Sequence, residues 1–249
     1  MTKKLQRQRF EYKYIIHENT ARSVRDFLSS YLDLDEFGSA QPGNSYSVHS
    51  LYLDSPDLIL YKTTINGDKN RYKLRIRFYE CEPDSPVFFE IKRRLNNIII
   101  KKRAGLRREA VRWILAGHLP GPEDYIQASP EQRHNISHFS MLLNRLGAVP
   151  QVHVSYSREA WINGSNSVRV TMDRHVRSEP QKEFRLQAGM MDPVDVFRNN
   201  VVLELKFTDR FPVWFRDLIQ VFGLRQGPAA KYADGVYNMG ELGLMSHYL

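Results

Sequence analysis

Basic residues alternate with apolar ones in several short segments of this 249-residue chain. In the segment 71–79, Lys73, Arg75 and Arg77 are separated from one another by single aliphatic residues. Because side chains two residues apart share one face of a strand, these cations would lie together on one face. Arginine can bind phosphate oxygens through two hydrogen bonds at once, so such a row suits a phosphorylated ligand.

Four further segments repeat this alternation, and in each of them a carboxylate accompanies the cation. They are EYK at 11–13, EIK at 90–92, RVTMD at 169–173 and ELK at 204–206. One strand of this kind is most simply the solvated face of a half-buried antiparallel sheet. Five such strands favour another arrangement, in which the charged faces point into a barrel and the apolar faces pack against outer helices.

A tunnel lined by like charges is unfavourable when it is empty, because the cations repel one another in a confined space. An inorganic polyphosphate or a nucleoside triphosphate would offset that cost with its own negative charge. The carboxylates would have little reason to lie among phosphates unless they held a divalent cation, and Mg²⁺ and Mn²⁺ prefer oxygen ligands. The pattern therefore predicts a tunnel that binds phosphates and a divalent metal ion.

The elements that would position these residues follow from periodicity. Strands are expected at 9–16, 45–53, 71–79, 87–93, 98–103, 151–161, 167–176, 183–186 and 200–207. Helices are expected at 20–31, 106–116, 130–146, 211–222 and 229–239. This order indicates the α+β class, with an antiparallel eight-stranded β-barrel tunnel and peripheral helices. Strands 87–93 and 98–103 would form a hairpin through 95–97. No linker interrupts the chain, so we expect one domain over residues 1–249.

Composition limits the partners and the compartment. The net charge of +8 indicates an anionic partner, and the single cysteine, Cys81, excludes an intrachain disulfide or a Cys/His zinc cluster. No signal peptide or membrane-spanning apolar run is visible, so a cytoplasmic protein is expected. Nucleic acid is not expected, because the aromatic residues mostly alternate onto the face opposite the basic ones.

These segments resemble the triphosphate tunnel metalloenzyme superfamily, with its CYTH-like fold. More specifically, the chain resembles the polyphosphate polymerase domain of the vacuolar transporter chaperone (VTC) complex in its free-standing bacterial form. The resemblance runs from Phe10 to about Tyr237. It is carried by RFEYKY at 9–14, YLDS at 52–55, RYKLRIRFY at 71–79, FFEIKRR at 88–94, KKR at 101–103, SYSREAW at 155–161, VRVTMDR at 168–174, VVLELKF at 201–207 and KYADG at 231–235.

The resemblance implies transfer of the ATP γ-phosphate to a growing polyphosphate chain, without a covalent enzyme intermediate. The implied catalytic cations are Lys13, Arg75, Arg77, Lys92, Arg158 and Lys206. The implied further contacts to substrate are Lys73, Arg103, Arg169 and Lys231. Mn²⁺ or Mg²⁺ would be held mainly by Glu204, with Glu11 and Glu90 assisting and Asp173 as a further candidate.

Two other functions remain open on the same residues. One is a tripolyphosphatase or nucleoside triphosphatase, and the other is a non-catalytic polyphosphate-binding module. Many tunnel hydrolases begin with two glutamates, and Arg9 replaces the first of them here, which suits the polymerase branch. ATP and polyphosphate or tripolyphosphate are the expected partners, and a membrane-protein partner is left open.

Overall fold

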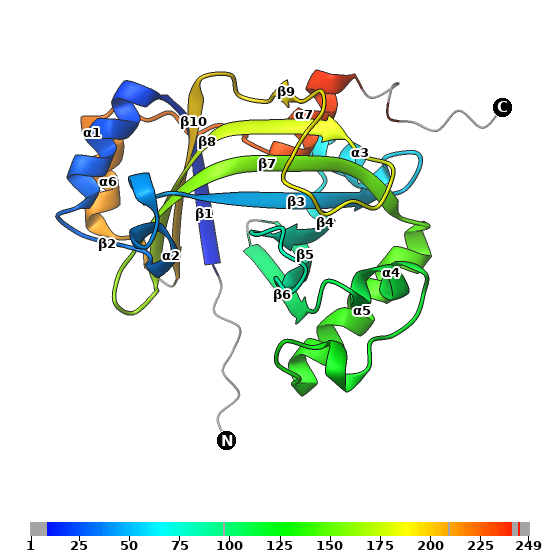
Figure 1. Cartoon of the computed structure of the whole chain (residues 1–249). Coiled ribbons are helices and arrows are strands. Elements are labelled where there is room, and N and C mark those ends of the chain that lie inside the picture. The colour runs from blue at the N-terminus through cyan, green and yellow to red at the C-terminus, as the bar shows by residue number, and fades with distance from the viewer. Residues whose placement is uncertain (1–8, 97, 209, 241–243, 245–249) are drawn as a thin grey trace.

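The computed structural model describes residues 9–96, 98–208, 210–240 and 244 of the chain (Figure 1). The strands are β1 (Arg9–His17), β2 (Asp33–Leu34), β3 (Tyr46–Asp54), β4 (Asn70–Phe78), β5 (Val87–Leu95), β6 (Ile98–Leu106), β7 (Val149–Ile162), β8 (Val168–Pro180), β9 (Val194–Asp195) and β10 (Asn200–Thr208). The α-helices are α1 (Glu18–Leu28), α2 (Glu36–Ser39), α3 (Ile59–Ile65), α4 (Ala110–Leu115), α5 (Pro130–Leu146), α6 (Val213–Val221) and α7 (Lys231–Met239). In the described ranges, no helix combines the length and the apolarity needed to cross a bilayer.

The strands form one antiparallel sheet, which confirms the α+β class. Their order is β2-β7-β3-β4-β5-β6-β1-β10-β8-β9, and β7 also pairs with β8. β1 pairs with β10 along its whole length, but the described residues of β1 and β6 are paired only at Arg9 and Ile99. Eight long strands follow one another as β7-β3-β4-β5-β6-β1-β10-β8, with the two-residue strands β2 and β9 added at the ends, and the β7–β8 pairing joins the first and last of the eight. Because β1 and β6 share a single described pair, the predicted closed barrel stays a prediction.

Local sequence signals explain where the elements agree with prediction and where they differ. Helix α5 has the predicted bounds, because the Ser129 hydroxyl caps it and Gly147 ends it in the left-handed conformation (φ 56°). The predicted strand at 183–186 is wrong, since this segment is a loop that packs Leu186 into the core. In the predicted turn at 95–97, Asn96 has φ 53°, and Asn97 lies outside the described residues.

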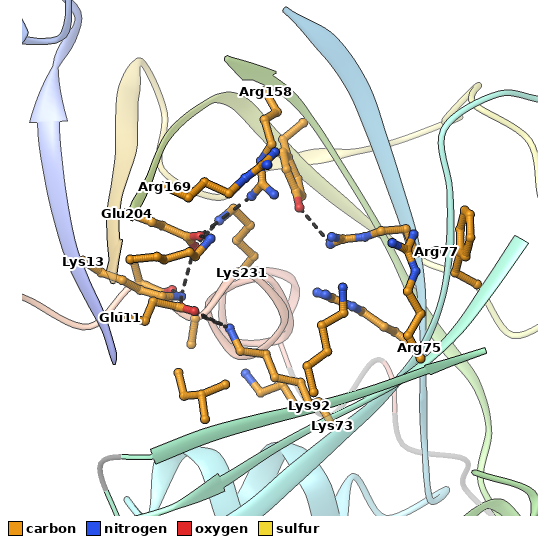
Figure 2. A pocket seen from close by; sticks show the side chains of 18 of the residues that line it. Glu11, Lys13, Lys73, Arg75, Arg77, Lys92, Arg158, Arg169, Glu204 and Lys231 are labelled. Carbon is orange, nitrogen blue, oxygen red and sulfur yellow. Dashed lines mark hydrogen bonds and ion pairs between the residues drawn. The ribbon is translucent and has the colours of Figure 1, made fainter. Parts of the chain in front are cut away.

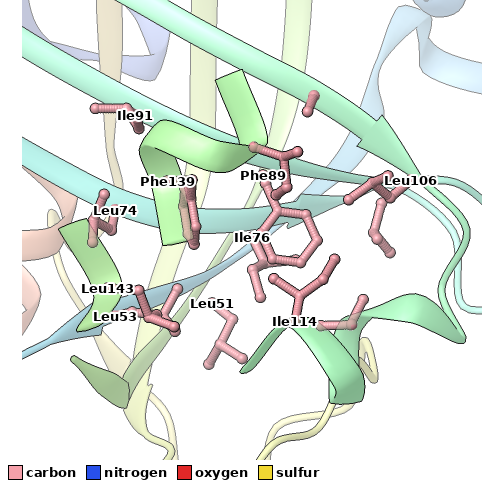
Figure 3. Close-up of a cluster of buried hydrophobic side chains, with 14 of the residues drawn as sticks. Leu51, Leu53, Leu74, Ile76, Phe89, Ile91, Leu106, Ile114, Phe139 and Leu143 are labelled. Carbon is pink, nitrogen blue, oxygen red and sulfur yellow. The ribbon is translucent and has the colours of Figure 1, made fainter. Parts of the chain in front are cut away.

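The alternation of the strands sorts the side chains into two environments. Leu74 and Ile76 of β4 and Phe89 of β5 pack with Phe139 of α5 and Ile114 of α4 in a fully apolar cluster (Figure 3). A second apolar cluster joins the corresponding faces of β1, β8 and β10 to helices α1 and α6. The helices therefore cover the apolar faces, and the charged faces are left on the concave side of the sheet.

Candidate functional site

The charged strand faces line a cavity of about 1350 Å³ (Figure 2). Fourteen lysines and arginines but only four glutamates lie among its lining residues. Strand register produces this concentration of charge, because Lys73 is paired with Lys92, and Arg75 with Glu90, across β4 and β5. Paired residues of an antiparallel ladder point to the same face. The cavity is consequently strongly basic.

On the β4 wall, Arg75 is held by a buried carboxylate. Its guanidinium lies 2.6 Å from Glu90 Oε2, and its Nη1 donates a hydrogen bond of 3.1 Å to the Tyr52 hydroxyl. Glu90 is fully buried and also lies 2.6 Å from Lys101 Nζ and 3.3 Å from Arg103 Nε. Burial raises the pKa of Glu90, but Arg75, Lys101 and the other cations outweigh it and hold that pKa well below its usual value. Glu90 is therefore an ionised counter-ion beneath the cavity wall.

Arg77 and Lys73 are cations on the same wall that have no carboxylate partner. Arg77 is buried and donates to the Tyr156 hydroxyl at 2.8 Å and to Ser50 Oγ at 3.2 Å. Lys73 Nζ lies 5.8 Å from the centre of the Tyr232 ring. Neither forms an ion pair with any described acidic residue. Burial lowers the pKa of Lys73 to about 8, although Tyr52 opposes the shift. No described carboxylate therefore neutralises these two positive charges by direct contact.

On the opposite wall, Glu204 is surrounded by cations from four elements, β1, β7, β10 and α7. Its Oε1 lies 3.3 Å from Lys13 Nζ of β1 and 3.1 Å from Lys231 Nζ of α7, while Oε2 contacts Lys206 of β10 and Arg158 lies 3.8 Å away. Burial raises the pKa of Glu204, yet Lys206, Lys231 and Lys13 lower it well below its usual value. The cluster fixes the ammonium groups around one anion at the cavity surface.

Two further carboxylates extend this network. Asp173 accepts two hydrogen bonds of 2.7 Å from Arg158 and lies 2.7 Å from Lys231 Nζ. Glu11 lies 3.0 Å from Lys92 Nζ and 3.3 Å from Lys13 Nζ. Asp173 is thus engaged by cations in the same way as Glu204.

The structure brings the predicted cations together. All ten line the cavity: Lys13, Lys73, Arg75, Arg77, Lys92, Arg103, Arg158, Arg169, Lys206 and Lys231. Glu11 and Glu204 line it as well, whereas Glu90 lies behind its wall. Their roles in binding and catalysis stay predictions. Sequence reasoning missed Tyr52 and Tyr156, although Tyr52 stands on the face of the 45–53 strand that its pairing with Arg75 turns toward the cavity.

The donor set fits a divalent cation that is bound together with phosphate. Lys13 Nζ lies 3.3 Å from one oxygen of Glu11 and from one of Glu204, so the two carboxylates converge on one region. Magnesium is commonly held by one or two carboxylates and completes its shell with phosphate oxygens and water. In the part of the chain that the structure describes, no three His, Cys, Asp or Glu residues gather into a metal site. Glu204 and Glu11 would hold such an ion at the cavity surface, and the predicted part of Glu90, which lies behind the wall, stays a prediction.

The fold and this cavity define an α+β protein with a strongly basic cavity on the concave side of an antiparallel sheet. The family model of the VTC domain matches residues 8–239, and the chain belongs to this family. The family is associated with polyphosphate synthesis, which gives the chain a polyphosphate-related function and points to an enzyme. A search of curated proteins gave no match.

Proposed function

We propose that this protein is a metal-dependent polyphosphate polymerase that transfers the γ-phosphoryl group of ATP to a polyphosphate chain in the basic cavity. The carrying observation is the charge imbalance of that cavity, with fourteen lining cations against four lining glutamates. Arg77 and Lys73 form no ion pair with a described carboxylate, so a bound anion would supply their missing counter-charge.

The reaction would be a direct displacement at phosphorus. A terminal oxygen of the acceptor chain attacks the γ-phosphorus of ATP, the bond from that phosphorus to the β,γ-bridging oxygen breaks, and ADP leaves. Charge in the transition state spreads over the equatorial oxygens, so fixed cations lower its energy. Arg75 and Arg77 would contact those oxygens from one wall, and Lys206 from the other. A divalent ion on Glu204 and Glu11 would supply additional positive charge to the phosphates.

The state of the carboxylates favours transfer to phosphate over transfer to water. Hydrolysis is helped by a general base that takes a proton from water, and such a base works best with a pKa near the working pH. Burial raises the pKa of Glu11, but Lys92 and Lys13 outweigh it and hold it far below that range. Glu204 is lowered in the same way by Lys206 and Lys231. An acceptor phosphate is already ionised and needs no such base.

The test is incubation of the purified protein with ATP and Mn²⁺, with long-chain polyphosphate followed on a gel and free phosphate measured in parallel. We expect polymer from the wild type and from Arg216→Ala, a control arginine on α6 that is exposed and outside the cavity. Arg77→Ala and Glu204→Gln should abolish it. Free phosphate without polymer would instead identify a hydrolase. Tight polyphosphate binding with neither product would identify a binding module.

A further inference from the structure

A row of aromatic rings lines one end of the cavity, where the Arg103 guanidinium lies 3.5 Å from the centre of the Phe88 ring and Arg169 donates to the Tyr46 hydroxyl. The row consists of Phe37, Tyr46, Tyr79 and Phe88. Successive ring centres lie 6.0, 6.1 and 6.0 Å apart, with interplanar angles of 59°, 58° and 69°. The rings therefore touch at an angle and do not stack face to face. Phe37 is 62% exposed, which leaves its ring accessible from the cavity.

Phe37 is held in place by a buried polar network beneath it. It lies on α2, a short helix whose capping residue Asp35 accepts a hydrogen bond of 2.8 Å from the Gly38 amide. The other oxygen of Asp35 lies 2.6 Å from Arg169 Nη2 and accepts a 3.2 Å hydrogen bond from the Tyr46 hydroxyl. Asp35 is itself buried. Because the Phe37 ring belongs to a contiguous row of aromatic side chains and stands on an anchored backbone, it is suited to contact a ligand.

The two ends of the cavity differ in charge. Along β4 and β5, Arg71 is paired with Arg94 at one end, and Arg77 with Phe88 toward the other. At the aromatic end, the exposed lining residues Glu36 and Glu80 are acidic. The two arginines at the aromatic end are each paired with a carboxylate, Arg103 with Glu90 and Arg169 with Asp35. Phosphate is therefore less favoured there, beside Glu36 and Glu80, than at the arginine end. The aromatic end therefore suits an uncharged, planar group attached to a phosphate chain.

We propose that this aromatic row is a subsite for the nucleobase of the nucleoside triphosphate donor, an inference that rests on the proposed function. The base would lie against Phe37, and the triphosphate would extend past Arg77 toward Arg75. Tyr79 and Arg75 are four residues apart on one strand face, roughly 13 Å at the usual rise, which is comparable with the length of a nucleoside triphosphate. Because stacking on an aromatic ring tolerates any base, discrimination between purine bases should be weak.

The test compares two ligands that share a triphosphate and differ in the nucleoside. Calorimetry with ATP and with inorganic tripolyphosphate, in buffer without divalent metal to prevent turnover, gives both affinities. We expect Phe37→Ala to lower the affinity for ATP by about tenfold, as loss of one base–aromatic contact does. The affinity for tripolyphosphate should be unchanged. Phe37→Trp should retain ATP binding. The matched control is Trp113→Ala, which removes an equally exposed aromatic residue outside the cavity and should alter neither affinity.

The outcomes distinguish failure of the nucleobase subsite from failure of the proposed polymerase function. If Phe37→Ala leaves the ATP affinity intact, or weakens both ligands equally, the nucleobase subsite is wrong while phosphate binding stands. If wild-type protein binds neither ligand, the proposed function fails and the subsite fails with it. A selective loss of ATP affinity in Phe37→Ala, together with retention in Phe37→Trp, would support the subsite.

Discussion

Replacing Lys73 by methionine should make the protein more stable and a weaker binder of phosphate. Lys73 is half-buried on the cavity wall and has no described carboxylate partner. Burial lowers its pKa from 10.5 to about 8, despite the opposing effect of Tyr52. A pKa difference of this size corresponds to at most roughly 3 kcal/mol against folding. Because water reaches part of the side chain, we expect about 1–2 kcal/mol from the substitution at pH 7.

The destabilisation caused by Lys73 should depend on pH in a characteristic way. A lysine whose pKa is lower in the folded state destabilises the fold fully below about pH 8, where it is charged in both states. The penalty decreases as the pH rises toward 10.5 and then disappears. Urea unfolding at pH 7 and at about pH 9.5 should therefore show a gain in stability for Lys73→Met that shrinks at the higher pH.

Urea unfolding and calorimetry together test whether Lys73 is retained for the ligand. The exposed Lys69 is the control, and Lys69→Met should alter neither stability nor ligand binding. Calorimetry at pH 7 should show that Lys73→Met lowers the affinity for tripolyphosphate by at least about tenfold, the usual effect of one lost charged contact. A Lys73→Met protein that is less stable at pH 7, or that binds tripolyphosphate as tightly as wild type, would refute the view that this unpaired charge is retained for the ligand.

Three more predictions concern other groups in the cavity. Glu90→Gln should lower the free energy of unfolding by about 3 kcal/mol in urea, because it leaves buried cations without their counter-charge; an unchanged midpoint would contradict this. Burial lowers the pKa of Lys206 to about 8 against the pull of Glu204, so the affinity for tripolyphosphate should fall between pH 7 and pH 9 as that lysine loses its proton; a constant affinity would argue against its contact with phosphate. Burial raises the pKa of Tyr52, but Arg75 and the neighbouring cations lower it to about 7. The ultraviolet absorbance of phenolate should therefore titrate near neutral pH and disappear in Tyr52→Phe, and bound tripolyphosphate should move the titration upward.

The sequence alone determined which face of each strand carries charge. Lys73, Arg75 and Arg77 share one face because alternation is a property of the extended backbone, independent of what the strand pairs with. The same periodicity predicted the apolar faces, and the antiparallel α+β class followed from the order of elements. Closure could not be derived in this way, because the β1–β6 seam depends on the curvature of the whole sheet.

Tertiary structure decided which charges are neutralised and which remain. Glu11 meets Lys92 across 81 positions of sequence, and Glu204 meets Lys231 across 27, so register and helix packing set these pairs. Glu90 shows this: the sequence places it two residues from Lys92, like the other alternating carboxylates, whereas the structure buries it against Arg75 as a counter-ion. Arg77 and Arg75 look alike in sequence, but in the structure Arg75 is paired with Glu90 and Arg77 has no described carboxylate partner. Electrostatic energy depends on distances in space, and strand alternation fixes only the face on which a charge lies.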